Sequence, residues 1–498
     1  MHYDAVIIGS GFGGSCAAYA LARAGLKTVV LERGRMTHRD EDDWDAGKIL
    51  IESRYRSQSP VRVRQYGARQ YTDFFPNEVV GGNSVFYGGA SLRLRERDFE
   101  SWPISYDALE KYYCEAEQLL GVHGESGVDE YEPYRSQEYP SAPIELAPPA
   151  RRIQAAAREI GLRPFRIPLA INFTDESRPI CIRCITCDGF PCRIEAKNDA
   201  ATTVLRRAQE LGAEVMAGTI ADRLEESEGR VRAVHCVDRA SRRKLELRSG
   251  LFVLSAGALH SPGILLRSKL GRFPGSRFIG RFLMRHCNSV VAGIFPFRTN
   301  PEKVFHKQLC FGEFYEDHRD RHGRATGVIQ DIYTPPASAI RHFAPAGVKR
   351  LAAAAAPFMQ NLLCIAEDEP RFENAVQLSG ETDTFGMETV QVDHQYSDAD
   401  YESRDVLVSQ ARRVLKAAGA LMTRVHKIDS FSHAVGTVRC GDSPEESVLD
   451  ADCRFHGVGN LYVLDGSSFP ASGGVNPSLT IAANALRVAE RLGAELSP

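Results

Sequence analysis

The sequence predicts an α/β fold with a parallel sheet at its centre, and three segments carry this prediction. Residues 4–34 read as a buried strand, a glycine-rich turn, a helix and a second strand. Residues 455–492 repeat the order of strand, glycine-rich loop and helix. Between them, the run VLSAGA at 253–258 is typical of a late parallel strand that ends in small residues.

The turn after the first strand fits the pattern G-x-G-x-x-G, with Gly9, Gly11 and Gly14 at its glycine positions. In a Rossmann-like domain the first glycine permits the tight turn and the second lets the backbone approach a pyrophosphate. The third allows the helix to pack closely on the strand. Glu32 closes the second strand, where an acid binds ribose hydroxyls. The pattern predicts a dinucleotide site and does not separate FAD from NAD.

The C-terminal unit contains a buried strand at 460–464, followed by Asp465, Gly466 and a Gly/Ser/Pro loop. We expect the helix after this loop to begin at Pro477, because proline suits the first helical position. Asn476 would then be the N-cap residue. The positive end of this helix would point towards the nucleotide domain, where it can stabilise negative charge on a reduced cofactor.

A series of motifs in the same order resembles the glucose–methanol–choline (GMC) oxidoreductase family of FAD-dependent flavoproteins, which includes bacterial alcohol oxidases and dehydrogenases. The resemblance extends along nearly the whole chain. It is carried by the N-terminal unit, VVGGNSVFYGGASLRLRERDFESWPIS (79–105), WPISYDALEKYYCEAEQLLGV (102–122), LSAGALHSPGILLRS (254–268), GRFLMRH (280–286), NAVQLSGETDTFG (374–386), SHAVGTVRCG (432–441) and the C-terminal unit.

The resemblance implies two discontinuous domains: an α/β FAD-binding Rossmann-like domain of GMC type, and an α+β substrate-binding domain on a large, mostly antiparallel sheet. The FAD-binding domain would comprise residues 1–40, 75–125, 181–299 and 430–498. The substrate-binding domain would comprise residues 41–74, 126–180 and 300–429.

The resemblance also implies the chemistry. His433 matches the catalytic histidine of the family, and Asn476 matches its partner, which is a second histidine in other members. His433 would accept the hydroxyl proton of an alcohol while hydride passes to flavin N5, and Asn476 would hydrogen-bond the same oxygen. An alternative role for Asn476 is to cap the last helix. We expect His286, His456 and His260 to be structural.

Further residues are expected to contact FAD. Residues 77–95 contain no histidine of the kind that links FAD covalently in some family members, so we expect a non-covalent cofactor. The expected contacts are Gly9, Gly11, Phe12, Gly13, Gly14, Glu32 and Arg33 in the first unit, Gly81, Gly82, Asn83 and Ser84 in the glycine-rich loop, and Ala256, Gly257, Asp465, Gly466, Asn476 and Pro477.

The leading substrate hypothesis is a polar polyol, namely a sugar, glycoside, cyclitol or amino sugar of aminoglycoside type, oxidised to an aldehyde or ketone. A sterol or long-chain alcohol is the alternative, because VVGGNSVFYGG and the His/Asn pair also resemble cholesterol oxidases. The electron acceptor, O2 or another, stays open, and related folds also host flavin lyases. Several acidic and aromatic residues could line a pocket but are more typical of a solvated face. They are Glu313, Phe314, Tyr315, Glu316, Asp317 and Asp331.

The stretch CIRCITCDGFPC places four cysteines between Cys181 and Cys192. Its spacing overlaps the start of a ferredoxin run but differs in the last gap and lacks the proline after the final cysteine. One alternative is therefore an electron-transfer subunit with an iron–sulfur centre here. We favour a structural, thiol-rich loop at the junction of the domains, and we expect no metal site.

Composition and charge indicate which partners and which cellular location to expect. The 498 residues carry a net charge of −3, which argues against a nucleic-acid partner. No apolar run reaches the ~18 residues of a membrane span, and the N-terminus has no basic signal-peptide region. We therefore expect a cytoplasmic protein with reduced thiols, acting as a monomer or small homo-oligomer on a small-molecule alcohol.

Overall fold

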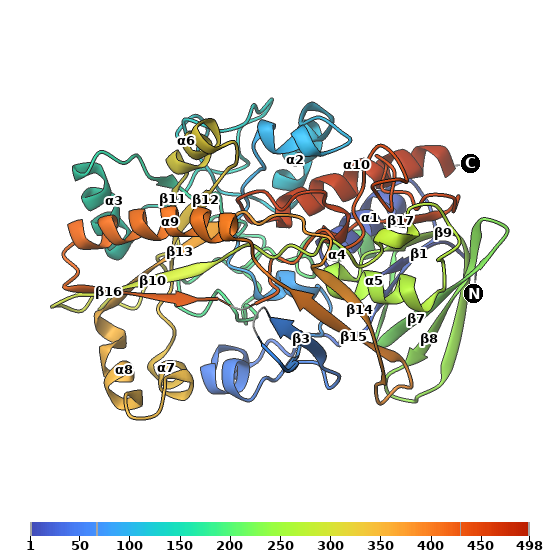
Figure 1. The fold of residues 1–498 in the computed structure, drawn as a ribbon, viewed down its shortest axis with the longest axis horizontal. Helices are drawn as coiled ribbons and strands as arrows, with labels where there is room; N and C mark the ends of the chain where they lie inside the picture. The colour runs from blue at the N-terminus through green and yellow to red at the C-terminus, as the bar shows by residue number, and fades with distance from the viewer. Residues whose placement is uncertain (1, 66–67, 429, 497–498) are drawn as a thin grey trace.

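The N-terminal and C-terminal units meet in one seven-stranded sheet, at the right of Figure 1. The computed structural model describes residues 2–65, 68–428 and 430–496. In spatial order the sheet comprises β6 (Glu214–Ala217), β2 (Thr28–Glu32), β1 (Tyr3–Ile8), β9 (Lys244–Leu254), β8 (Arg230–Asp238) and β7 (Thr219–Ser227), with β17 (Leu461–Val463) also paired to β9. The strands from β6 to β9, together with β17, are parallel, whereas β7 and β8 form an antiparallel extension.

The parallel strands are buried because their sequences are apolar on both faces. All five residues of β2 are buried, and so are the last four of β1. Helices cover the sheet: α1 packs on α10 and α4, α10 packs on α2, and α5 packs on β7. These helices are α1 (Phe12–Arg23), α2 (Asp107–Leu119), α4 (Val204–Glu210), α5 (Gly257–Arg267) and α10 (Ser478–Leu496). The predicted α/β core is confirmed.

The second sheet has six antiparallel strands. In spatial order they are β16 (Met422–Lys427), β10 (Ser289–Ile294), β13 (Met359–Ala366), β12 (Gly327–Ile332), β11 (Leu309–Phe311) and β5 (Phe165–Arg166). Helices α3 (Pro148–Glu159) and α9 (Asp398–Ala417) cover one face, where apolar side chains such as Leu362 and Leu407 form a separate core. The large antiparallel sheet is as predicted. Strand β10 belongs to this antiparallel sheet, whereas the expected range 181–299 included it in the FAD-binding domain.

A third sheet joins segments that are far apart in sequence. Its strands are β14 (Ala375–Thr382), β15 (Glu388–His394), β3 (Val61–Gln65) and β4 (Thr72–Phe74), and β15 pairs with β3 in parallel. The remaining helices are α6 (Glu313–His322), α7 (Ala337–Phe343) and α8 (Lys349–Ala355), with short turns of helix η1 (Glu41–Trp44), η2 (Gly47–Ile51), η3 (Gly82–Phe86), η4 (Glu96–Ser101), η5 (Ser276–Phe278), η6 (Ala356–Phe358) and η7 (Gly466–Ser468).

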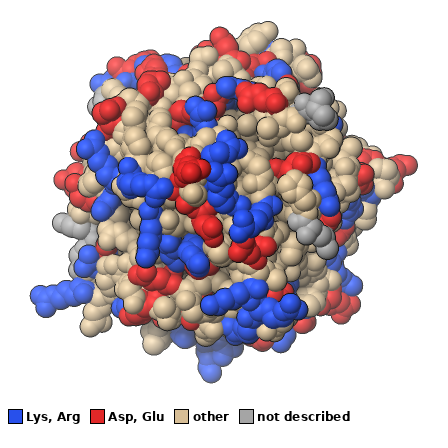
Figure 2. Space-filling view, turned by 90° about the vertical axis from the view of Figure 1, so that its right-hand side faces the viewer, with Lys and Arg blue, Asp and Glu red and all other residues tan. Residues whose placement is uncertain are grey.

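Charges of both signs are interspersed on the face of the molecule that Figure 2 shows, which is the right-hand side of Figure 1. Partly exposed ion pairs also join distant segments of the chain, such as Arg23 with Glu490. Across the part of the chain that the structure describes, no helix combines the length and the apolar character needed to cross a membrane.

Candidate active site

The three glycines of the first turn differ in what surrounds them. A Cβ atom on Gly9, where φ is +105°, would lie 2.2 Å from the Ser255 carbonyl oxygen. A Cβ atom on Gly14 would lie 1.9 Å from the Gly9 carbonyl oxygen. A Cβ atom on Gly11, the N-cap of α1, would meet no atom within 4 Å. Packing therefore requires Gly9 and Gly14, while the space beside Gly11 is open, as a pyrophosphate at a helix N-terminus requires.

Ser10 connects this turn with the acid and with the glycine-rich loop (residues 79–92). Glu32 Oε2 accepts hydrogen bonds from the Ser10 amide at 3.0 Å and from Ser10 Oγ at 2.5 Å, and Glu32 Oε1 accepts from the Gly34 amide at 2.7 Å. Ser10 Oγ in turn accepts from the Gly81 amide at 2.9 Å. Burial raises the pKa of Glu32, although these hydrogen bonds oppose the shift. Glu32 is thus held at the C-terminal end of β2, where a ribose would bind.

Asp465 plays a similar linking role at the other end of the chain. Its Oδ2 accepts from the Gly257 amide at 2.8 Å and from Ser261 Oγ at 2.6 Å, and its Oδ1 accepts from the Ser467 amide at 2.7 Å. Gly257 has φ of +81° and open space beside it. The turn, the glycine-rich loop and this acid therefore lie close together: a Cβ atom on Gly82 would lie 3.5 Å from Gly11 Cα, and one on Gly13 would lie 1.7 Å from the Leu464 carbonyl oxygen. They form a candidate cofactor site, in which the open space beside Gly11 and Gly257 would accommodate FAD.

The other expected contacts are placed as follows. Ser84 Oγ donates to the Gly81 carbonyl at 2.6 Å and accepts from the Ala200 amide at 3.0 Å, which shapes the loop. Arg33 forms an ion pair with Glu78 at 2.5 Å. Phe12 and Gly13 are buried, and Asn83 is exposed. A Cβ atom on Gly82 would lie 3.5 Å from Gly11 Cα, the Ala256 amide donates to Ser261 Oγ at 3.0 Å, and Pro477 directly follows Asn476.

The side chains of His433 and Asn476 are in contact. Asn476 Nδ2 lies 3.3 Å from His433 Nε2, and Asn476 Oδ1 accepts from Gln330 Nε2 at 2.8 Å. Gln330 is fully buried in β12. Its bond fixes which end of the Asn476 amide faces the imidazole, so the donor end points at His433 Nε2.

His286 lies on the other side of the His433 ring. The two Nδ1 atoms are 2.9 Å apart, and His286 Nε2 lies 3.3 Å from the Ser472 carbonyl oxygen. A carbonyl can only accept, so His286 carries its proton on Nε2 and accepts from His433 on Nδ1. His433 then carries its proton on Nδ1 and leaves a lone pair on Nε2. His286, expected to be structural, is therefore in direct contact with the candidate base.

The surroundings keep both rings neutral. Burial lowers the pKa of His433 well below its usual range, and the nearby His286 and Lys307 lower it further. Burial also lowers the pKa of His286, and the charge of Asp368 opposes this. The Asp368 carboxylate accepts from the backbone amides of His286 at 3.0 Å and Arg285 at 2.8 Å. A neutral His433 with a free Nε2 lone pair can accept a proton.

The start of α10 differs by one residue from the prediction. The helix begins at Ser478, and its first turn is closed by the bond from the Ile481 amide to the Pro477 carbonyl. Pro477 therefore takes the cap position and Asn476 precedes it, so the N-cap prediction for Asn476 was wrong. The Asn476 side chain contacts Gln330 and His433 instead.

The acidic and aromatic segment is not the solvated face that its charges indicated. Asp317 is exposed, but Tyr315, Glu316 and Asp331 are buried. Tyr315 Oη donates to Asp98 Oδ2 at 2.8 Å and accepts from the Gly474 amide at 2.7 Å, just before Asn476. These side chains brace the loop that carries Asn476.

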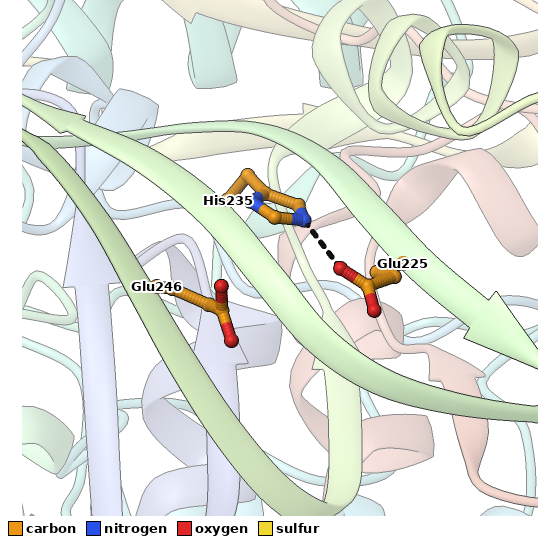
Figure 3. A group of neighbouring side chains, drawn as sticks. All are labelled: Glu225, His235 and Glu246. Carbon is orange, nitrogen blue, oxygen red and sulfur yellow. Dashed lines mark hydrogen bonds and ion pairs between the residues drawn. The ribbon is translucent and has the colours of Figure 1, made fainter.

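The cysteine loop (residues 181–192) contains free, partly buried thiols. Burial raises the pKa of Cys181 to about 11 and that of Cys187 to about 12, so both are protonated at neutral pH. Among the described residues, three metal-ligating atoms lie within 4.8 Å of one another only in Glu225, His235 and Glu246. These three project from β7, β8 and β9 on the molecular surface (Figure 3), and His235 Nε2 lies 2.9 Å from Glu225 Oε2.

Sequence reasoning missed Gln330 and Ser10. The available signal for Gln330 was a polar residue inside the apolar strand GVIQDI. Ser10 had no signal beyond its place inside the glycine pattern. His286 ends the motif GRFLMRH, but nothing in the sequence pairs it with His433.

Comparisons with known proteins agree with this geometry. Two family models, both described as GMC oxidoreductase, match residues 3–288 and 370–485. The chain is 30% identical to 6'''-hydroxyparomomycin C oxidase of Streptomyces lividus and 30% identical to paromamine 6'-oxidase of Streptomyces fradiae, in both cases over 99% of this chain and 92% of the relative. The fold is similar to that of pyridoxine 4-oxidase from Mesorbium loti, with a TM-score of 0.72 at 19% identity, over 98% of this chain and 99% of the other.

Proposed function

Since the chain belongs to the GMC oxidoreductase family, we propose that it oxidises an alcohol CH–OH group of a polar polyol to an aldehyde or ketone. It is an FAD-dependent oxidoreductase acting on CH–OH donors. The substrate class that we propose is a sugar, glycoside, cyclitol or amino sugar.

The observation that carries the proposal is the lone pair on His433 Nε2, which faces the Asn476 amide at 3.3 Å. This contact is longer than a good hydrogen bond, so both groups have capacity left for a substrate oxygen. The hydroxyl of an alcohol would donate to His433 Nε2 and accept from Asn476 Nδ2. His433 takes the proton, and the amide holds the oxygen as negative charge develops on it.

We propose that the candidate cofactor site around Gly11, Glu32, Gly81 and Asp465 holds FAD. When bound, FAD supplies the hydride acceptor, and the protein positions and polarises the alcohol. We propose that the cofactor is held non-covalently, which the lack of histidine in residues 77–95 supports.

A polar substrate suits the unpartnered polar atoms of the buried interior. Within the described residues, the Oε1 of Gln330, whose Nε2 donates to Asn476, is buried without a hydrogen-bond partner, and so are Tyr333 Oη and His306 Nδ1, whose rings are 5.4 Å apart. Such atoms are costly unless a ligand or water bonds them, and hydroxyl groups of a polyol can do so. The names of the two Streptomyces relatives, for hydroxyparomomycin C and paromamine, support the same class. This favours a polyol over a sterol or long-chain alcohol.

The function is tested by anaerobic bleaching of the flavin with a panel of sugars, aminoglycosides, sterols and aliphatic alcohols. For a substrate so identified, His433→Ala should retain FAD but slow flavin reduction by ~10²–10⁴-fold, the range of general-base catalysis. His456→Ala is the matched control, because that ring is partly exposed and lies 3.0 Å from Ser447 Oγ. Normal reduction kinetics in His433→Ala would remove the assignment of the base.

We further propose a cytoplasmic monomer or small homo-oligomer, with reduced thiols. The free state of all twelve cysteines supports this location. Peroxide release during turnover in air distinguishes O2 from another electron acceptor.

A further inference from the structure

The cysteine loop is fastened to the glycine-rich loop. The Gly189 amide donates to the Phe86 carbonyl at 2.7 Å. Lys197 Nζ donates to the carbonyl oxygens of Tyr87 at 2.8 Å, Cys187 at 3.1 Å and Phe190 at 2.8 Å. The backbone of residues 187–190 is thereby held beside the glycine-rich loop, which forms part of the candidate cofactor site.

Asp188, within this segment, forms an ion pair with Lys307, which lies just before β11 of the second sheet. Lys307 is 3% exposed, and its Nζ lies 3.0 Å from both carboxylate oxygens of Asp188. The pair lies against Gly88, where an added Cβ atom would come within 1.9 Å of Asp188 Oδ1 and 2.6 Å of Lys307 Nζ. The glycine-rich loop therefore leaves room for this pair.

The two buried lysines beside the cysteine loop differ in their remaining capacity. An ammonium group has three N–H donors. Those of Lys197 meet three backbone carbonyls, so this side chain is saturated. Lys307 has one carboxylate as its partner among the described residues, which engages two donors and leaves the third for another acceptor.

Strand pairing places this pair near the candidate base. Cys310, three residues after Lys307, pairs with Gln330, whose side chain donates to Asn476. The His306 and Tyr333 rings are 5.4 Å apart, and the charge of Asp188 acts on both of them. The charge of Lys307 contributes to the lowered pKa of His433, after burial and His286. Lys307 therefore lies within electrostatic reach of His433, on the segment that leads into β11, the strand next to the one that carries Gln330.

We propose that Lys307, anchored by Asp188, is a specificity-determining residue whose third N–H donates to a substrate oxygen and whose charge excludes a substrate ammonium group from that position. The inference rests on the proposed function and deepens it. The substrate presents a hydroxyl or other oxygen beside the reacting carbon, and any amino groups lie elsewhere in the molecule. The cysteine loop serves this subsite through Asp188 rather than through its thiols.

Small probes test the subsite without a known substrate. Acetate and methylammonium are titrated into the oxidised holoenzyme, with the flavin absorbance spectrum as the readout. Acetate should bind the wild-type protein, and Lys307→Met should weaken this binding by ~10–100-fold, as expected for a hydrogen bond to a charged donor. Methylammonium should not bind the wild-type protein. Lys303→Met is the matched control, because Lys303 is exposed in the same segment.

Lys307→Met leaves the Asp188 carboxylate without its cation, and an unpaired carboxylate could itself repel acetate. The double variant Asp188→Asn/Lys307→Met removes this charge as well, and its affinity for acetate should fall by the same factor. Acetate binding that survives both changes would overturn the inference. So would a wild-type protein that binds no acetate, or one that binds methylammonium as tightly. These outcomes stand even if no alcohol of the panel bleaches the flavin, a result that would count against the proposed function alone. If glucose bleaches it, kcat/KM for glucose over glucosamine should fall ~10-fold or more in Lys307→Met.

Discussion

His433 can accept a proton only if its Nε2 carries a lone pair, and residues outside its own segment set that tautomer. The Ser472 carbonyl determines the proton position on His286, and His286 determines it on His433. Gln330 determines which end of the Asn476 amide meets Nε2. The neighbouring charges are Lys307, which disfavours a protonated ring, and Asp368, which acts through His286. These polar contacts together hold His433 as the neutral tautomer with its lone pair on Nε2.

Gln330 gives a test of this chain. In Gln330→Leu, the Asn476 amide loses the donor that orients it, so its oxygen can turn towards His433 and repel the substrate oxygen. We expect flavin reduction by substrate to slow by ~10-fold, with FAD content and KM nearly unchanged, since the loss is about that of one hydrogen bond. Gln360→Leu is the control, because Gln360 is buried in β13 and donates instead to the Pro149 carbonyl. Equal slowing in both variants would refute the orienting role.

The sequence motifs predicted His433 and Asn476 because each lies within a short segment with its own pattern. Gln330 and His286 could not be paired with them in advance, since these contacts join β12, the segment before β10 and the C-terminal loop. The one-residue error at α10 has a local cause. Asn-Pro is good chemistry for a helix start, and only the tertiary contact with Gln330 shows that Asn476 lies outside the cap.

At the scale of elements, β12 and the strand beside it are joined through a buried carboxyl group. Asp331 Oδ1 accepts from the backbone amides of Gln308 at 2.6 Å and Leu309 at 2.7 Å. Burial outweighs these bonds and raises the pKa of Asp331 from 3.8 to about 8. The folded protein therefore holds this proton up to about pH 8, whereas the unfolded chain releases it near pH 4. The stabilisation that the protonated group provides is lost as pH rises through this range.

Asp331→Asn keeps the Oδ1 acceptor and removes the titration. Relative to wild type, the variant should therefore be more stable at pH 8 than at pH 5: the difference in free energy of unfolding, variant minus wild type, should rise by ~1–3 kcal/mol between these pH values. Urea unfolding at the two pH values measures the difference. Asp317→Asn, at an exposed position on α6, should show no such change. A relative stability of Asp331→Asn that is the same at both pH values would contradict the shifted pKa.

The sequence predicted an element correctly where the pattern lies within a single segment of the chain. Strands β1 and β2 were predictable from continuous apolar runs. The expected FAD-binding range 181–299 includes β10, whereas β10 pairs with β13 and β16 in the antiparallel sheet, and the apolar run SVVAGI does not show which strands it pairs with. The acidic segment around Tyr315 was misread because charge composition does not show that Arg319 and Asp98 pair with each other in the interior.

At the scale of the whole molecule, the candidate cofactor site is assembled from distant parts of the chain. Gly11 comes from the first turn, Gly81 from the glycine-rich loop, Gly257 from the middle and Asp465 from the C-terminal unit. The family resemblance predicted this assembly, whereas local patterns alone predicted two separate strand–turn–helix units. Because one ligand would contact all four parts, its binding should stabilise the fold as a unit.

The open space at Gly11 makes this linkage testable. Acid precipitation of the holoenzyme tests whether the cofactor is non-covalent, because FAD should then appear in the supernatant. The thermal test uses apoprotein that is prepared under conditions that permit refolding. FAD at ~1,000 times its Kd should stabilise the wild-type apoprotein by ~4 kcal/mol, seen as a higher thermal midpoint. A Cβ atom on Gly11 meets no protein atom within 4 Å, so Gly11→Val should leave the apoprotein midpoint nearly unchanged and abolish the rise with FAD. Gly14→Ala, whose Cβ would lie 1.9 Å from the Gly9 carbonyl oxygen, should instead lower the midpoint of the apoprotein itself. If Gly11→Val still gains the full stabilisation from FAD, the pyrophosphate does not lie beside this turn.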